Sequence, residues 1–253
     1  MTKGTPPVTP PHHPHGATAT APLLGSVFDE LGREIVSGEH PAGTQFTLHA
    51  ISERFGISRT VARETMRALE HVGLVAAGRR VGITVLEQRH WALFDPAVIS
   101  WRLAAPTQRS AQLASLNELR MAVEPVAARQ AADNASPQQR AEILELASTL
   151  VHLAKMPAEA GRQEDDAADF LATDLRFHSL LLEASGNEMF AALVPVFFAI
   201  HSGKTVFGVG ADKPVANTLD LHQELAQYVS DGDGIHAERT SHALLHEVAR
   251  SLE

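Results

Sequence analysis

Apolar residues recur at helical spacing over most of this chain. Near the N-terminus, apolar positions every three or four residues predict a helix over 23–38. The positions that carry this spacing are Leu24, Val27, Phe28, Leu31 and Ile35. Two shorter amphipathic stretches predict further helices at about 48–55 and 58–71.

The third of these helices has clear ends. Gly56 lies in the turn before it, Ser58 is a suitable N-cap, and Gly73 follows its last turn. Two short β-like runs come next, at 74–76 and 81–86, and predict a hairpin. Helix, turn, helix and hairpin in this order are typical of a winged helix-turn-helix, in which the hairpin is the wing.

From residue 96 onward the pattern is helical throughout. Proline and glycine break it into segments at about 96–105, 109–133, 137–155, 163–185, 188–206, 214–231 and 235–251. Their lengths suit an antiparallel bundle of about six or seven helices. The expected fold class is therefore mostly α: a winged helix-turn-helix with a small β-wing over 23–86, a linker over 87–95 and a helical bundle over 96–253.

Composition narrows the chemistry. Residues 1–22 are rich in Thr, Pro, Ala and His, which predicts a disordered tail; the PHHPH run at 11–15 could bind a metal adventitiously, but a flexible tail is favoured. The chain has no cysteine, which excludes disulfides, thiolate catalysis and cysteine-ligated zinc. No apolar run is long enough to span a membrane, and no signal core is present. A cytoplasmic, nucleoid-associated location is expected.

Charge is unevenly distributed. The net charge of −9 argues weakly against nucleic acid as a partner. Basic and acidic residues nevertheless balance between residues 26 and 86, so the excess of acid lies from residue 87 onward. The region of the expected winged helix is therefore not biased against DNA.

Basic residues gather at the start of the helix expected at 58–71. Arg59 and Arg63 are four residues apart and share one face, and arginine can contact guanine edges or phosphates. The predicted DNA-binding residues are Ser58, Arg59, Thr60, Arg63 and Arg67 on the helix and Arg79 and Arg80 on the wing. A solvated helix face would explain any one of these arginines, but their occurrence together with the turn, the cap and the wing favours DNA binding.

These motifs occur in an order that resembles the GntR family of bacterial regulators. The matching runs are IVSGE at 35–39, PAG at 41–43, Phe46, FGISRTVARE at 55–64 and LEHVGLV at 69–75. The chain departs from the family at 61–62, where Val-Ala stands in place of the common Pro-Val, so the operator sequence stays open. The resemblance implies a sequence-specific DNA-binding transcription regulator.

Asp174 and His178 place a carboxylate and an imidazole on one helix face, and such a pair can bind a divalent metal. A chance surface pair is the simpler interpretation in a chain with 14 histidines. A longer set of residues favours the metal, because it resembles the helical FCD-type ligand-binding domain of the FadR subgroup. This set is Arg120, Glu124, Pro125, Asp174, His178, Ser185, Gly186, Asn187, His222 and Leu225.

That second resemblance implies a metal held by one aspartate and three histidines, with a carboxylate effector beside it. The matching ligands are Asp174, His178 and His222. The last histidine of the family aligns with Leu244, and His242 and His246 lie two residues away on either side. A zinc, nickel or manganese-class ion on three ligands and a metal-free polar effector pocket both remain open.

The segment WALFDPAVISW at 91–101 is similar to the linker of sugar-acid-responsive regulators of the galactonate operon repressor group. On this analogy the effector is an aldonate or uronate, and Arg120 would pair with its carboxylate. A structural salt bridge between Arg120 and Glu124 is an equally open role. Further effector-binding residues expected are Asp174, His178, Asn187, Ser202 and His222, although ordinary helix positions are the favoured interpretation of His201 and Ser202.

We therefore expect a metabolite-responsive repressor, without enzymatic activity, that binds a palindromic double-stranded operator as a homodimer. The alternative is a metal-dependent enzyme built on Asp174, His178 and His222, but no convincing base or nucleophile motif accompanies these residues. A nonspecific nucleoid-type binder is disfavoured, because the N-terminal region is neutral and the bundle is acidic.

Overall fold

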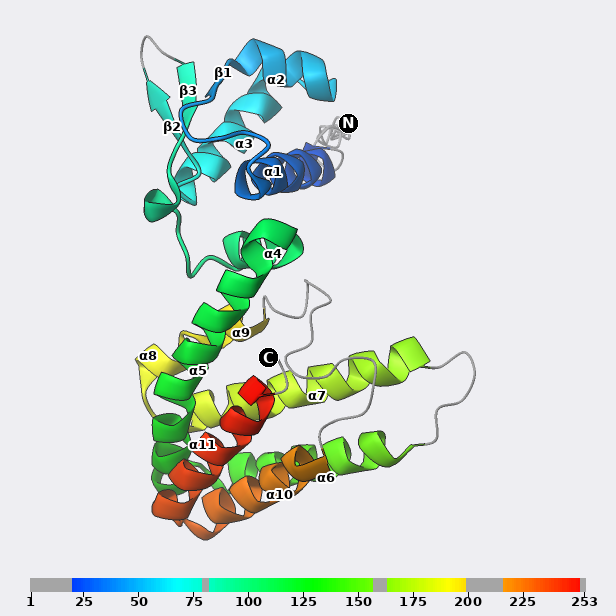
Figure 1. Cartoon of the computed structure of the whole chain (residues 1–253), viewed down its shortest axis with the longest axis vertical. Helices are drawn as coiled ribbons and strands as arrows, with labels where there is room; N and C mark the ends of the chain where they lie inside the picture. The colour runs from blue at the N-terminus through cyan, green and yellow to red at the C-terminus, as the bar shows by residue number, and fades with distance from the viewer. Residues whose placement is uncertain (1–19, 79–81, 157–162, 199–215, 251–253) are drawn as a thin grey trace, which may run out of the picture. The chain divides into compact units, whose positions relative to one another are not determined.

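The computed structural model describes residues 20–78, 82–156, 163–198 and 216–250. The chain divides into two compact units, Met1–Trp91 and Ala92–Glu253 (Figure 1). Residues 1–19 of the tail expected at 1–22 lie outside the described residues. The wing arginines Arg79 and Arg80 also lie outside them.

The first unit is a winged helix-turn-helix, as expected. Its helices are α1 (Thr20–Ser37), α2 (Leu48–Phe55) and α3 (Arg59–His71), followed by the short 3₁₀ helix η1 (Gln88–His90). The strands β1 (Gln45–Phe46), β2 (Val75–Gly78) and β3 (Gly82–Val85) form an antiparallel sheet in the order β1-β3-β2. Val75 lies opposite Val85 and Gly78 opposite Gly82, so β2 and β3 form the hairpin of the wing.

Local caps define α2 and α3. The hydroxyl of Thr47 accepts a hydrogen bond from the backbone N–H of Ala50, and that of Ser58 accepts from the N–H of Val61 at 3.3 Å. Gly56 ends α2 in the left-handed conformation, with φ at +61°. The turn and the start of α3 are therefore encoded by adjacent residues.

Two features of this unit were not expected. Strand β1 is only two residues long, which is too short to give an alternating pattern in the sequence. It is a strand because its backbone pairs with β3. Helix α1 begins at Thr20 rather than at 23, since Pro22 falls in the first helical turn, where the missing N–H costs no intrahelical bond.

The second unit is a helical bundle. Its helices are α4 (Pro96–Ala104), α5 (Pro106–Asn134), α6 (Pro137–Lys155), α7 (Gln163–Ala184), α8 (Glu188–Ala191), α9 (Val194–Phe198), α10 (Ala216–Asp231) and α11 (Gly234–Arg250). The expectation of one continuous helix over 188–206 is wrong for the described part, 188–198. Two short helices, α8 and α9, are found there, and the helix is interrupted between them shortly before Pro195. Residues 199–206 lie outside the described part of the chain.

Small side chains let α5 approach its neighbours in the bundle core. Helix α5 contributes Ala128, Ala131 and Ala132, all buried, to a cluster with Phe177 of α7 and Leu225 of α10. Helices α5 and α11 pack against each other, as do α10 and α11 and α6 and α7. Alanine at these positions permits close helix contact, which brings polar residues of α5, α7 and α10 into one interior.

Within the described residues, no helix is both long enough and apolar enough to cross a lipid bilayer.

The junction between α3 and η1 depends on Gly73. Its φ is +76°, and a Cβ atom there would lie 2.0 Å from the carbonyl oxygen of His90. We expect Gly73→Ala to lower the free energy of unfolding by about 3 kcal/mol, from left-handed strain and overpacking together. Gly56→Ala is the matched control, because Gly56 is also left-handed but has open space around it; it should lose about 1 kcal/mol. Equal losses in chemical denaturation would contradict the close approach at His90.

Candidate functional site

Helix α3 separates its apolar and basic residues onto two faces. The buried face packs against α1 and α2 and consists of Val61, Ala62, Thr65, Met66 and Leu69. The exposed positions include Arg59, Thr60, Arg63 and Arg67. Four of the predicted DNA-binding residues thus share the solvent side of one helix, with Ser58 as its cap.

The arginines on this face differ in their partners. Arg67 forms an ion pair with Glu64 at 2.9 Å on the exposed surface, which is worth little in water. Among the described residues, Arg59 and Arg63 form no ion pair with an acidic side chain. Their guanidinium groups are therefore available to an anionic partner such as a phosphate backbone.

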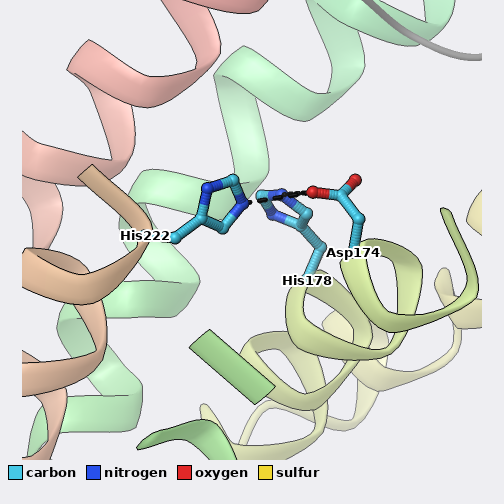
Figure 2. A group of neighbouring side chains, drawn as sticks. All are labelled: Asp174, His178 and His222. Atoms are coloured by element: carbon cyan, nitrogen blue, oxygen red, sulfur yellow. Dashed lines mark ion pairs between the residues drawn. The ribbon is translucent and has the colours of Figure 1, made fainter. Parts of the chain in front are cut away.

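A second cluster lies inside the helical bundle. Helix α7 positions Asp174 and His178, and α10 brings His222 beside them (Figure 2). The Nε2 atom of His222 lies 3.1 Å from Oδ1 of Asp174, and the Nε2 atom of His178 lies 3.7 Å from the same oxygen. Both imidazoles are buried, so the surface-pair interpretation of Asp174 and His178 is wrong.

The other ring nitrogen of each histidine contacts an oxygen of its own. The Nδ1 atom of His222 is 2.7 Å from the backbone carbonyl of Thr218. The Nδ1 atom of His178 is 2.6 Å from Oε2 of Glu124 on α5. Both histidines consequently turn Nε2 toward Asp174, the arrangement in which metal-ligating histidines are commonly held.

Two of the three separations between donor atoms suit a divalent ion, and all three donors lie within 4.8 Å of one another. Two ligand atoms at about 2.1 Å from one metal lie about 3.0 to 3.4 Å apart at right-angled or tetrahedral geometry, close to the separations from Asp174 to His178 and His222. The Nε2 atom of His222 is also buried without a directed hydrogen bond. Nitrogen and oxygen donors in this combination fit zinc, nickel or manganese.

A buried charge network extends from the cluster into α5. Arg120 donates hydrogen bonds from Nε and Nη2 to the two carboxylate oxygens of Glu124. Burial alone would raise the pKa of Glu124, but the charge of Arg120 and the contact with His178 outweigh it and lower the pKa to about 2. Burial likewise opposes ionisation of Asp174, yet His178 and His222 hold the pKa of Asp174 well below its usual range. Both carboxylates are therefore ionised at neutral pH.

Among the side chains of α11 that the structure describes, none belongs to the cluster. Leu244, the position of the family's last histidine, is fully buried in the apolar core with Phe177 and Leu225. His242 and His246 are exposed and stack on each other with ring centroids 6.5 Å apart. They lie on the solvent side of α11, as the helical rotation of two residues requires.

The remaining predicted effector residues are less informative. The side chain of Asn187 caps α8 by accepting a hydrogen bond from the N–H of Met189, which is a structural role. His201 and Ser202 lie outside the described residues. The contact of Glu124 with His178 was missed by sequence reasoning, because only the spacing to Arg120 is visible in the sequence.

Two family models match the chain. The model for bacterial regulatory proteins of the gntR family matches residues 23–85, and the FCD domain model matches residues 100–247. The first match covers nearly all of the described winged helix-turn-helix, and the second contains all three residues of the buried cluster.

Three curated proteins align with most of the chain. The galactonate operon transcriptional repressor of Escherichia coli (strain K12) is 26% identical over 227 residues, 88% of this chain and 93% of that protein. The uncharacterized HTH-type transcriptional regulator YieP of the same organism is 26% identical over 218 residues, 86% and 90% of the two chains. The HTH-type transcriptional repressor NanR of Klebsiella aerogenes is 28% identical over 213 residues, 79% and 70% of the two chains.

A solved structure shares the fold. It is that of Lar, described as controlling the expression of the Listeria monocytogenes agr system. The two structures are 15% identical, the match covers 90% of this chain and 95% of that one, and the TM-score is 0.58.

The cluster makes a direct prediction about metal binding. We expect His222→Gln to weaken binding of Zn²⁺ to the metal-free protein at least about 10-fold, measured by calorimetry or chelator competition, because one of three donors is lost. His242→Gln is the matched control, since His242 is an exposed histidine remote from the cluster in its contacts; it should leave the affinity unchanged. Equal affinities for the two variants would exclude the cluster as the zinc site.

Proposed function

Because the chain belongs to the GntR family of bacterial regulatory proteins and carries an FCD domain, we propose that this transcription regulator represses an operon for the breakdown of a sugar acid. The observation that carries the proposal is the coexistence of the basic face of α3 with the buried Asp174, His178 and His222 cluster. The basic face of α3 can contact DNA, and the buried cluster can bind a metabolite that controls DNA binding.

In this proposal α3 is the recognition helix. Its N-terminal end would enter the major groove, with Arg59 and Arg63 contacting guanine edges or phosphates. Thr60 is also exposed at this end of the helix, next to the cap residue Ser58. The positive N-terminal end of α3 would then lie close to a phosphate of the DNA backbone. Arg67 would lie farther along the same face, and Arg79 and Arg80 on the wing would approach the backbone or the minor groove.

We propose that two copies of the chain bind one operator. A single α3 can read only one short half-site, whereas a two-fold symmetric dimer reads a palindrome of two half-sites. Sequence-specific binding should then be strongly salt-dependent, because several arginines neutralise phosphates.

The effector site is proposed to be the buried cluster. Asp174, His178 and His222 would hold a divalent ion, and a bound ion supplies a Lewis acid with affinity for carboxylate and hydroxyl oxygens. Since Leu244 stands where a fourth ligand would come from, three protein donors leave positions open for the effector. A sugar acid fits, because its carboxylate and adjacent hydroxyl are both oxygen donors.

The proposed effector class is inferred from the similarity of this chain to sugar-acid-responsive regulators. The linker segment at 91–101 is similar to that of sugar-acid-responsive regulators, and one aligned relative is named for the galactonate operon. A metal-dependent enzyme using the same three residues finds no support in this family, whose members are transcription regulators. The cluster is thus better explained as a sensor than as a catalyst.

The recognition helix can be tested by substitution. We expect Arg59→Ala and Arg63→Ala each to weaken binding to a fragment of the upstream region of the chain's own operon by about 5- to 150-fold, which corresponds to the loss of about 1–3 kcal/mol for a base contact. Fluorescence anisotropy at two salt concentrations measures the affinity.

Arg33→Ala is the control for this experiment, because Arg33 is an exposed arginine of the same unit on α1. It should change the affinity by less than about 3-fold. If all three variants bound the fragment as tightly as the natural sequence does, α3 would not be the recognition helix.

The effector class can be tested by thermal shift. We expect D-galactonate, D-gluconate or D-glucuronate to raise the melting temperature in the presence of Zn²⁺, because a ligand of the folded state stabilises it by mass action. The rise should disappear after metal removal and in Asp174→Asn. D-galactose, which lacks the carboxylate, is the matched control; a rise of the same size with this neutral sugar would count against a carboxylate effector.

A further inference from the structure

We propose that Glu124 is a positioning residue of the metal site, which holds His178 in the orientation that presents Nε2 to the ion. Arg120 in turn holds Glu124. This inference rests on the proposed metal site, but it concerns residues of α5 that contribute no ligand themselves.

The contact between His178 and Glu124 determines which nitrogen faces the cluster. An imidazole nitrogen at 2.6 Å from an ionised carboxylate oxygen must carry a proton, since its lone pair would otherwise oppose the negative charge. The contact is bent rather than linear, because Nδ1 and Oε2 fall within bonding distance without the alignment of a directed hydrogen bond. With the proton at Nδ1, Nε2 of His178 is the nitrogen that would donate its lone pair to a bound ion.

His222 shows the same logic with a different acceptor. Its Nδ1 atom faces the backbone carbonyl of Thr218, which can only accept a hydrogen bond. With Nδ1 turned to this carbonyl, Nε2 of His222 would donate its lone pair to a bound ion in place of its present contact with Oδ1 of Asp174. The two histidines differ in the acceptor that orients them: His178 faces a charged carboxylate, and His222 faces a neutral carbonyl.

Glu124 requires Arg120 to remain in place. The Glu124 side chain is fully buried and Arg120 is 5% exposed, and a buried carboxylate without a cation would be strongly destabilising. Arg120 engages both oxygens of Glu124. The salt bridge between Arg120 and Glu124 is thus present, and it links this arginine to the proposed metal site through Glu124 and His178.

Zinc binding by the full chain tests the proposal with Glu124→Gln. The amide has the shape of the carboxylate but lacks its charge, and its NH₂ group can face Nδ1 of His178 and favour the wrong tautomer. We expect the affinity for Zn²⁺ to fall about 10- to 100-fold, the range for partners that orient metal ligands.

Glu142→Gln is the matched control. Glu142 of α6 is also paired with an arginine of α7, at 2.9 Å from Nε of Arg176, but that pair is half-exposed and does not touch the cluster. It should bind Zn²⁺ as the natural sequence does. Equal affinities of the Glu124→Gln and Glu142→Gln variants would overturn the proposal.

A spectroscopic readout decides the matter even if Glu124→Gln fails to fold. In the natural sequence labelled with ¹⁵N-histidine and loaded with Zn²⁺, long-range ¹H–¹⁵N spectra should show His178 bound through Nε2 with its proton on Nδ1. Zinc bound through Nδ1 of His178 would overturn the proposal. Both experiments measure the binding of zinc alone. Their failure can therefore be distinguished from a failure of operator binding or of the response to sugar acids, on which the proposed function depends.

Discussion

The interior of the bundle is organised around one buried charge, the carboxylate of Glu124. A buried carboxylate is tolerated only when cations and hydrogen-bond donors replace the water that it loses. Arg120 supplies the charge from the same helix, and His178 supplies a second contact from α7. Once these partners are in place, α5 and α7 are held in a register that also defines where Nε2 of His178 can lie.

The rest of the cluster follows from that register. His178 lies one helical turn after Asp174, so orienting the imidazole also places it against the aspartate. His222 then reaches the same oxygen from α10. The apolar core makes this convergence possible, because alanines on α5 allow the helices to approach while Phe177 and Leu225 exclude water. Polar chemistry and apolar packing are therefore parts of one arrangement.

The sequence predicts what depends on near neighbours. Ser58, Gly56 and Gly73 act within a few residues, so the limits of α3 and the presence of the wing could be expected. Asp174 and His178 are one turn apart and were expected to share a face. The partnership of Glu124 with His178 could not be foreseen, because it depends on the packing of α5 against α7. Strand β1 was likewise invisible, since its two residues gain their regularity only from β3.

Helix α5 connects the proposed sensor to the start of the second unit. Glu124 lies in its interior, next to Pro125, which has no N–H to bond to the preceding turn and so weakens the helix at that point. At the other end, α5 follows α4 after Ala105, and Ile99 and Leu103 of α4 share a core cluster with Leu116 of α5. A ligand can couple to DNA binding only by favouring one of two arrangements of such an element. A metal and effector at the proposed site would act on α5 through His178 and Glu124, close to the turn that Pro125 weakens. Helix α4, which precedes α5, follows directly on the linker that leads from the winged helix.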